Sequence, residues 1–155
     1  MCDPLKRHRL VVSVSVIKDN EVLLIKENKP TAFNKWNFPS GRVEHGEDNL
    51  NAASREVKEE TGLDVELLNT TGIYYFVSDL NDQVILFHFI GEIVGGTLRI
   101  DNEEIIDSKW VKLNEINNFT NLEFRNSMVL KQIFDALLSQ KSYPTTIFKE
   151  QLNNR

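Results

Sequence analysis

Four glutamates, one arginine and two glycines lie at fixed offsets within residues 41–63. The segment reads Gly-x5-Glu-x7-Arg-Glu-apolar-x-Glu-Glu-x-Gly-apolar, where x is any residue. At near-average residue usage, a random start position would match with a chance on the order of 10⁻¹⁰. Clustered carboxylates are explained by a hard divalent cation that neutralises them, and Mg²⁺ takes oxygen ligands. The residues at the fixed positions are Gly41, Glu47, Arg55, Glu56, Glu59, Glu60 and Gly62.

Three of these carboxylates are expected on one face of a helix. At about 100° per residue, Glu56, Glu59 and Glu60 fall within an arc of roughly 100°. Glu56 and Glu60 are four residues apart, and like charges at that spacing cost a few tenths of a kcal/mol in an isolated helix. A solvated acidic helix face is the alternative interpretation. It does not account for the glycines and the arginine around the glutamates.

The helix has its own start and stop signals. Asp48 or Asn49 can cap a helix whose interior runs from about residue 50 to residue 61, and Gly62 is a natural C-cap. An arc beside the glutamates carries apolar residues that can face a core. These residues are Leu50, Ala53 and Val57.

This segment resembles the Nudix box without a mismatch, and the preceding Trp-Asn-Phe-Pro-Ser-Gly of residues 36–41 is similar to the family as well. The resemblance spans roughly residues 9–138. It implies an α/β/α sandwich with a mixed β-sheet. The implied activity is hydrolysis of a diphosphate bond, usually in a nucleoside diphosphate linked to another group. The implied cofactor is Mg²⁺, with Mn²⁺ as the alternative.

The resemblance also implies roles for residues of the box. Glu56, Glu59 and Glu60 would hold the metal, and Glu56 would also act as the general base or orient it. Arg55, one turn before Glu59, is expected to fix the Glu59 carboxylate by a bidentate pair. Glu47 is expected to brace the loop onto the helix.

Ser40 is a departure from the family pattern. Many members carry Pro-Gly-Gly where residues 39–41 here read Pro-Ser-Gly. In the family, the backbone carbonyl just before the box glycine can bind metal, and Ser40 has that carbonyl too. A serine at positive φ would be strained. The ligand is therefore expected only if the local backbone conformation is retained.

Three further candidates lie outside the box. The family often adds an acidic residue from a later loop, and spacing to Trp110 favours Glu104 over Glu103, with an ordinary acidic turn as the alternative. Lys26 is expected either to meet a substrate phosphate or to be an exposed, solubilising lysine. Phe76 is expected either to stack on a base or to belong to the core.

Composition predicts a small globular protein. The 155 residues are expected to form one domain, 1–155, with its core at about 9–138 and a C-terminal tail at 140–155. The net charge of −5 argues against a surface that coats nucleic acid, so no stable nucleic-acid partner is expected. No apolar run approaches membrane-spanning length. One cysteine, Cys2, excludes an internal disulfide framework and suggests a reducing, cytoplasmic compartment. Monomer and homodimer both remain open.

The remaining pattern predicts strands, one helix between them and one helix last. This order indicates a mixed sheet covered on both faces. Residues 84–90 are apolar on both sides, as in a central strand. The expected strands are 10–17, 21–26, 65–78, 83–94 and 105–113, and the expected last helix is 125–139.

Substrate identity is the weakest signal in the chain. Residues 77–80 read Val-Ser-Asp-Leu where ADP-ribose-directed relatives tend to carry a proline. A MutT-type or broad hydrolase of nucleoside triphosphates and small diphosphates is the remaining expectation. A non-catalytic nucleotide sensor of the same fold is the alternative, although sensors usually lose box carboxylates. A diphosphate isomerase would need a catalytic cysteine, which Cys2 at the terminus cannot easily supply.

Overall fold

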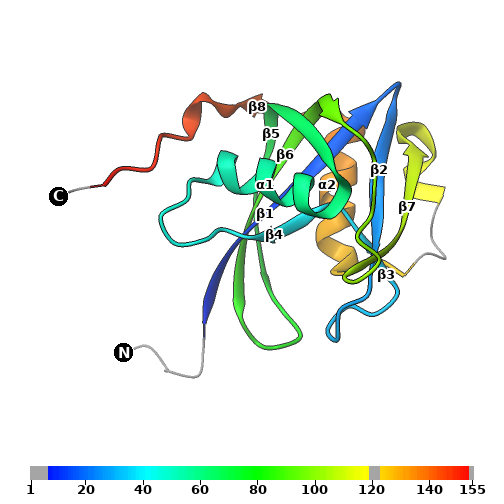
Figure 1. Ribbon diagram of the computed structural model, residues 1–155, viewed down its shortest axis with the longest axis horizontal. Coiled ribbons are helices and arrows are strands. Elements are labelled where there is room, and N and C mark those ends of the chain that lie inside the picture. The colour runs from blue at the N-terminus through cyan, green and yellow to red at the C-terminus, as the bar shows by residue number, and fades with distance from the viewer. Residues whose placement is uncertain (1–6, 119–122, 154–155) are drawn as a thin grey trace.

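A computed structural model of the protein describes residues 7–118 and 123–153. Within them, a mixed eight-stranded sheet has one α-helix on each face (Figure 1). The helices are α1 (Asn49–Thr61) and α2 (Ser127–Leu138), with short 3-10 turns η1 (Leu113–Asn118) and η2 (Thr145–Ile147). The strands are β1 (His8–Lys18), β2 (Glu21–Glu27), β3 (Lys35–Asn37), β4 (Ser40–Arg42), β5 (Leu63–Val77), β6 (Gln83–Gly96), β7 (Ile105–Lys112) and β8 (Tyr143–Pro144).

The sheet is mixed because β1 and β6 run parallel while the other paired strands run antiparallel. The main strand order is β3-β2-β1-β6-β5-β8, with β4 paired to β1 and β7 paired to β2. The end of β2 therefore lies between β3 and the start of β7. This topology brings the β2–β3 loop, the box and the loop before β7 to one region of the molecule.

Each helix packs its apolar face on a different side of the sheet. Val57 of α1 belongs to a cluster with Val14 of β1 and Phe89 of β6. Ile133 of α2 belongs to a second cluster on the opposite side, with Phe38 among its members. Burying these side chains removes apolar surface from water, at roughly 25 cal/mol per Å². The predicted α/β/α sandwich with a mixed sheet is confirmed.

The polar side of β1 is buried as well. Ser13 Oγ lies 2.6 Å from Nδ1 of His88, and Ser15 Oγ lies 2.6 Å from its Nε2. Burial lowers the pKa of His88 to about 3, so the ring is a neutral imidazole at physiological pH. A neutral imidazole has one N–H donor and one acceptor nitrogen. One serine therefore donates to the ring and the other accepts from it.

The segment expected as a C-terminal tail has contacts in the structure. Tyr143 and Pro144 of β8 pair with Thr70 and Asn69 of β5. The ring of Phe148 then packs at centroid distances of 5.8 Å from Phe87 and 5.1 Å from Phe89. This aromatic packing joins the tail to the α1 side of the sheet, and it is not apparent from local sequence patterns.

Two further expectations concern the single cysteine and membrane-spanning segments. Cys2 lies outside the described residues. Among helices in the described ranges, none is long and apolar enough to cross a membrane.

Candidate active site

Helix α1 begins and ends at the predicted signals. Oδ1 of Asp48 accepts a hydrogen bond of 2.8 Å from the backbone N–H of Asn51, which caps the N-terminus. Gly62 has a φ of 78° and donates its N–H to the carbonyl of Lys58 at 2.9 Å. This left-handed conformation strongly favours glycine. The caps therefore set the length of the helix that carries the box glutamates.

The three glutamates of α1 occupy unlike environments. The Glu59 side chain is 57% exposed, whereas those of Glu56 and Glu60 are 14% and 6% exposed. The difference follows from helical rotation, because Glu60 lies closest to the buried side of α1, where Val57 faces the core. One face of the helix thus carries a carboxylate in water and two in a largely desolvated setting.

Glu60 is held against the strand that opens the box. Its Oε1 accepts a hydrogen bond of 2.8 Å from the backbone N–H of Ser40. Burial raises the pKa of Glu60 to about 8, although Lys29 and the Ser40 N–H both favour the charged form. In the metal-free protein burial therefore disfavours the ionised form of Glu60, and the positive charge of Lys29 offsets part of that cost. A cation placed beside this carboxylate would favour its ionised form.

Ser40 does not carry the backbone strain that a positive φ would impose. It lies in β4, and it is not among the residues with positive φ. Its side chain is buried, and its Oγ accepts a hydrogen bond of 3.2 Å from Nδ2 of Asn37. Serine therefore fits the place of the first glycine of Pro-Gly-Gly without strain.

Gly41 is required by a close approach. A Cβ atom at this position would overlap the carboxyl group of Glu56. The lack of a side chain lets Glu56 pack directly on the backbone of β4. Burial also raises the pKa of Glu56, although the positive charge of Arg55 opposes the shift.

Arg55 forms its two-nitrogen pair with Glu47, and it contacts both oxygens of Glu59 through Nη1 alone. Nε lies 2.7 Å from Oε2 of Glu47, and Nη2 lies 3.0 Å from its Oε1. The hydrogen bonds from Arg55 lower the pKa of Glu47, and Glu47 in turn raises the pKa of Arg55. Two parallel N–H···O bonds fix the loop that carries Glu47 onto α1. This is the bracing position expected for Glu47.

The remaining nitrogen of the Arg55 fork contacts the other carboxylates. Nη1 lies 2.9 Å from Oε1 of Glu56 and 3.2 Å from Oε2 of Glu59. In this arrangement, no three acidic, histidine or cysteine side chains within residues 7–118 and 123–153 form a ready-made ion site. Nη1 thus lies between Glu56 and Glu59, and a cation held by both carboxylates would compete with it for these oxygens.

A buried charge network beside the box is missed by sequence reasoning. Glu27, at the end of β2, is fully buried. Its Oε1 accepts a hydrogen bond of 2.8 Å from Nδ2 of Asn37, and its Oε2 lies 3.0 Å from Nη1 of Arg125. Lys29 links this network to the box, since its Nζ lies 3.2 Å from Oε2 of Glu27 and 3.6 Å from Oε2 of Glu60. A glutamate that continues the alternation of the apolar residues Leu23 and Ile25 in β2 is the signal that could have found it.

Glu104 lies close to this network. The backbone N–H of Asn28 donates to the carbonyl of Glu104 at 2.7 Å, which ties the β2–β3 loop to the loop before β7. Burial alone would lower the pKa of Lys29, but the charges of Glu27, Glu60 and Glu104 raise it. The structure therefore places the charge of Glu104 within electrostatic range of Lys29. A role for Glu104 in the reaction stays a prediction.

The part of the chain that carries these carboxylates matches a known family model. The NUDIX domain family model matches residues 6–133. This chain belongs to the NUDIX domain family. A solved structure described as a NUDIX hydrolase from Nitrosomonas europaea superposes with a TM-score of 0.80 at 26% identity, and it covers 96% of this chain and 98% of its own.

Curated Nudix relatives support the same class. An ADP-ribose pyrophosphatase of Methanocaldococcus jannaschii is 33% identical over 82% of this chain and 77% of its own length. A putative 8-oxo-dGTP diphosphatase of Bacillus subtilis is 34% identical over 63% of this chain and 62% of its own. The chain spans as little as 22% of the length of other relatives. The predicted enzyme class, a Nudix hydrolase, is confirmed.

The structure does not bring Lys26 and Phe76 to the carboxylates of the Nudix box. Nζ of Lys26 lies 5.8 Å from the ring centroid of Trp36, at cation–π distance. Phe76 is partly buried and packs against the cluster on the α2 side of the sheet. The box glutamates belong to α1, on the other side. Of the two expectations for Phe76, the structure favours the core.

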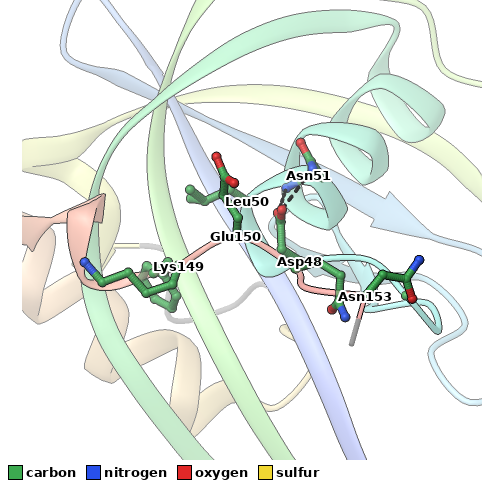
Figure 2. A pocket seen from close by; sticks show the side chains of 9 residues that line it. Asp48, Leu50, Asn51, Lys149, Glu150 and Asn153 are labelled. Carbon is green, nitrogen blue, oxygen red and sulfur yellow. Dashed lines mark hydrogen bonds between the residues drawn. The ribbon is translucent and has the colours of Figure 1, made fainter. Parts of the chain in front are cut away.

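A separate groove lies at the beginning of the Nudix helix. It has a volume of about 600 Å³ and runs between the start of α1 and the C-terminal segment (Figure 2). Figure 2 shows Asp48 and Asn51 on the helix side, with Lys149, Glu150 and Asn153 on the other. Asp48 caps the N-terminus of α1, while Glu56 and Glu60 lie in its second half. The groove is therefore distinct from the candidate active site.

Proposed function

We propose that this Nudix hydrolase is a divalent-cation-dependent pyrophosphohydrolase of nucleotides. It cleaves a diphosphate bond in a nucleoside triphosphate or in another small molecule linked through a nucleoside diphosphate. The observation that carries the proposal is a pair of carboxylates, the buried Glu60 and the partly buried Glu56, packed on the backbone of residues 40–41. Burying carboxylates is costly unless a cation or hydrogen bonds compensate for lost hydration.

The side chains present fit a hard divalent cation. Glu56, Glu59 and Glu60 offer carboxylate oxygens, and Ser40 adds a backbone carbonyl, which are the ligand types that Mg²⁺ and Mn²⁺ accept. Gly41 leaves room for the Glu56 carboxylate beside that backbone. We therefore propose Ser40, Glu56, Glu59 and Glu60 as the metal-binding residues.

The residues of the box have separate roles in hydrolysis. When bound, the cation screens phosphate charge and polarises a phosphoryl oxygen. Glu56, held against Gly41 beside Glu60, takes a proton from the attacking water as general base. Arg55 and Glu47 act as positioning residues that hold the box loop on α1. Glu104 adds a carboxylate from the loop before β7.

The proposed substrate class has a nucleoside on one side of a diphosphate bond. The two relatives described above are named for ADP-ribose and for 8-oxo-dGTP, and both of those molecules contain such a bond. The proline expected of ADP-ribose-directed enzymes is absent from residues 77–80. Nucleoside triphosphates therefore remain the first class to test, with ADP-ribose second. Lys26 and Phe76 do not enter the proposal, since the structure gives them other contacts.

A screen with Mg²⁺ tests the proposal, in which coupled pyrophosphatase converts the pyrophosphate released from triphosphates, and coupled alkaline phosphatase the phosphomonoesters released from the other compounds, to inorganic phosphate. The panel contains nucleoside triphosphates, 8-oxo-dGTP, ADP-ribose, nucleotide sugars and dinucleoside polyphosphates. We expect turnover of at least one nucleotide, and we expect excess EDTA to abolish it. Full turnover in EDTA would refute the metal requirement. Nucleotide binding without turnover of any compound would instead support a non-catalytic sensor.

A further inference from the structure

Lys29 lies among acidic side chains from three separate segments. Its Nζ is 3.2 Å from Glu27 at the end of β2 and 3.6 Å from Glu60 of α1. Its charge also acts on Glu56, and the charge of Glu104 acts on it from the loop before β7. An ammonium group thus lies among the carboxylates that are proposed to serve the metal and the reaction.

Glu27 has other partners that compensate for its burial. Arg125 contacts Oε2 at 3.0 Å, and the amide of Asn37 donates to Oε1 at 2.8 Å. Both are side chains outside the box, and they keep this carboxylate paired whether or not Lys29 is near. The presence of Lys29 is therefore not explained by Glu27 alone.

Glu60 depends on Lys29 more directly. Its Oε1 accepts from the Ser40 backbone, and its Oε2 has Lys29 as its ion-pair partner. A divalent cation on the Glu60 carboxylate would bring a second positive charge into the same space. At such distances two cations repel strongly in a poorly hydrated setting. Lys29 and a metal ion cannot both stay on Glu60 at low energy.

The side chain of Lys29 can leave without unfolding its loop. It is 24% exposed, so its flexible stem reaches solvent. The backbone next to it is anchored, because the N–H of Asn28 donates to the carbonyl of Glu104 at 2.7 Å. Rotation of the side chain alone therefore suffices to vacate the carboxylate.

We propose that Lys29 is the internal counter-ion of the metal site. It pairs with Glu60 in the metal-free protein, and a divalent cation displaces it. The inference rests on the metal site of the proposed function. Its consequence is that Lys29 stabilises the metal-free fold and weakens metal affinity.

The test measures Mn²⁺ affinity by titration calorimetry on substrate-free protein, together with thermal melts in EDTA. The variant Lys29→Met keeps an unbranched, flexible side chain one atom shorter than lysine and removes its charge. We expect it to bind Mn²⁺ about fivefold more tightly than the wild type, which is the scale of one partly exposed ion pair. We also expect its melting temperature in EDTA to fall by about 2–4 °C.

Two matched variants isolate the local charge. Lys29→Arg retains the positive charge and should bind Mn²⁺ as the wild type does. Lys131→Met removes an exposed lysine from α2, on the opposite side of the sheet, and should leave the affinity unchanged. Tightening by Lys131→Met equal to that of Lys29→Met would reduce the effect to net charge and overturn the proposal.

The outcomes separate this inference from the function on which it rests. If the wild type binds no Mn²⁺ and gains no stability from it, the metal site itself is wrong. If the wild type binds Mn²⁺ and Lys29→Met binds it with equal or weaker affinity, the metal site stands and the counter-ion role is wrong. Tighter binding together with a lower melting temperature in EDTA supports the counter-ion role.

Discussion

The carboxyl group of Glu56 lies against the α-carbon of Gly41, in the space that the Cβ of any other residue would take. The conflict in a Gly41→Ala variant is with the end of a flexible side chain, so the glutamate moves and the strand does not. We expect the variant to keep its fold and to lose about 100-fold in kcat/KM, the scale of a misplacement of about 1 Å. Steady-state kinetics with Mg²⁺ and thermal melts measure the two effects.

Gly46→Ala is the matched control for that experiment. Gly46 has open space around it but a φ of +79°. Alanine there should cost stability, about 1–2 kcal/mol, because the left-handed conformation is unfavourable for residues with a Cβ. If Gly41→Ala retains full activity, the contact between residues 41 and 56 has no part in catalysis.

Glu60→Gln should separate stability from activity. The pKa of Glu60 is raised from 4.5 to about 8 in the metal-free fold. A raised pKa means that the folded state binds this proton more tightly, so the stability it contributes is present below pH 4.5 and is lost as pH rises through 8. Removing the titration should leave metal-free stability at pH 7.5 unchanged or higher. Removing a charged ligand should lower kcat by several orders of magnitude.

Thermal melts in EDTA across pH 5–9 check the first half of that prediction. The wild type should lose melting temperature with rising pH more steeply than Glu60→Gln. Added Mg²⁺ should raise the wild-type melting temperature more than that of the variant, because a ligand stabilises by mass action. A variant that melts lower in EDTA yet turns over at wild-type speed would end the assignment of Glu60 to the metal.

Glu47→Gln should weaken both the fold and the reaction. The change removes the charge that holds Nε and Nη2 of Arg55, at a cost of about 1 kcal/mol for a partly exposed pair. It also frees Arg55 to turn toward the metal-binding carboxylates, so kcat should fall. Urea unfolding and kinetics measure the two effects. Glu44→Gln is the control. The Glu44 side chain is 67% exposed, and its Oε1 makes a longer contact of 3.6 Å with Nη1 of Arg55. We therefore expect this change to alter neither the stability nor kcat.

Glu104→Gln should cost more activity than Glu103→Gln. Both residues are exposed, and both donate their backbone N–H to Oδ1 of Asp101. The charge of Glu104 reaches Lys29 beside the box. We expect kcat to fall by about tenfold or more for Glu104→Gln, with its melting temperature unchanged, since general acid–base and charge effects of one side chain are commonly of this size or larger. A larger loss for Glu103→Gln would reverse the assignment.

The burial of His88 predicts acid sensitivity. Its pKa is lowered from 6.5 to about 3 in the folded protein. Between these two pH values the unfolded chain binds a proton on this ring and the folded chain does not. The corresponding stability is present above pH 6.5 and is lost as pH falls toward 3. The ring NMR signals of His88 should not titrate between pH 5 and 8. Ser15→Ala should cost about 1–3 kcal/mol by leaving a buried ring nitrogen unpaired; a titrating ring or a neutral Ser15→Ala variant would contradict the network.

The elements with local signals could be predicted closely. Helix α1 runs from Asn49 to Thr61, against an expected interior of 50–61, because its cap, its periodicity and its terminal glycine all act within one or two turns. Strand β7 and helix α2 are also found within two residues of the expected bounds. The segment after residue 140 could not be predicted, because the position of Phe148 depends on two rings of β6 that are distant in sequence.

The sequence by itself determined the family, the sandwich fold and the helix face that carries Glu56, Glu59 and Glu60. Those features follow from the spacing of residues a few positions apart, because helix and strand geometry fix the side of the element on which each residue lies. Only the tertiary structure decided that Glu60 is buried while Glu59 is exposed, and that the fork of Arg55 goes to Glu47. It also decided that Glu27 pairs with Arg125, 98 positions away along the chain. Burial and ion pairing depend on which distant segments meet, and the charge that each carboxylate keeps depends on the water that those segments exclude.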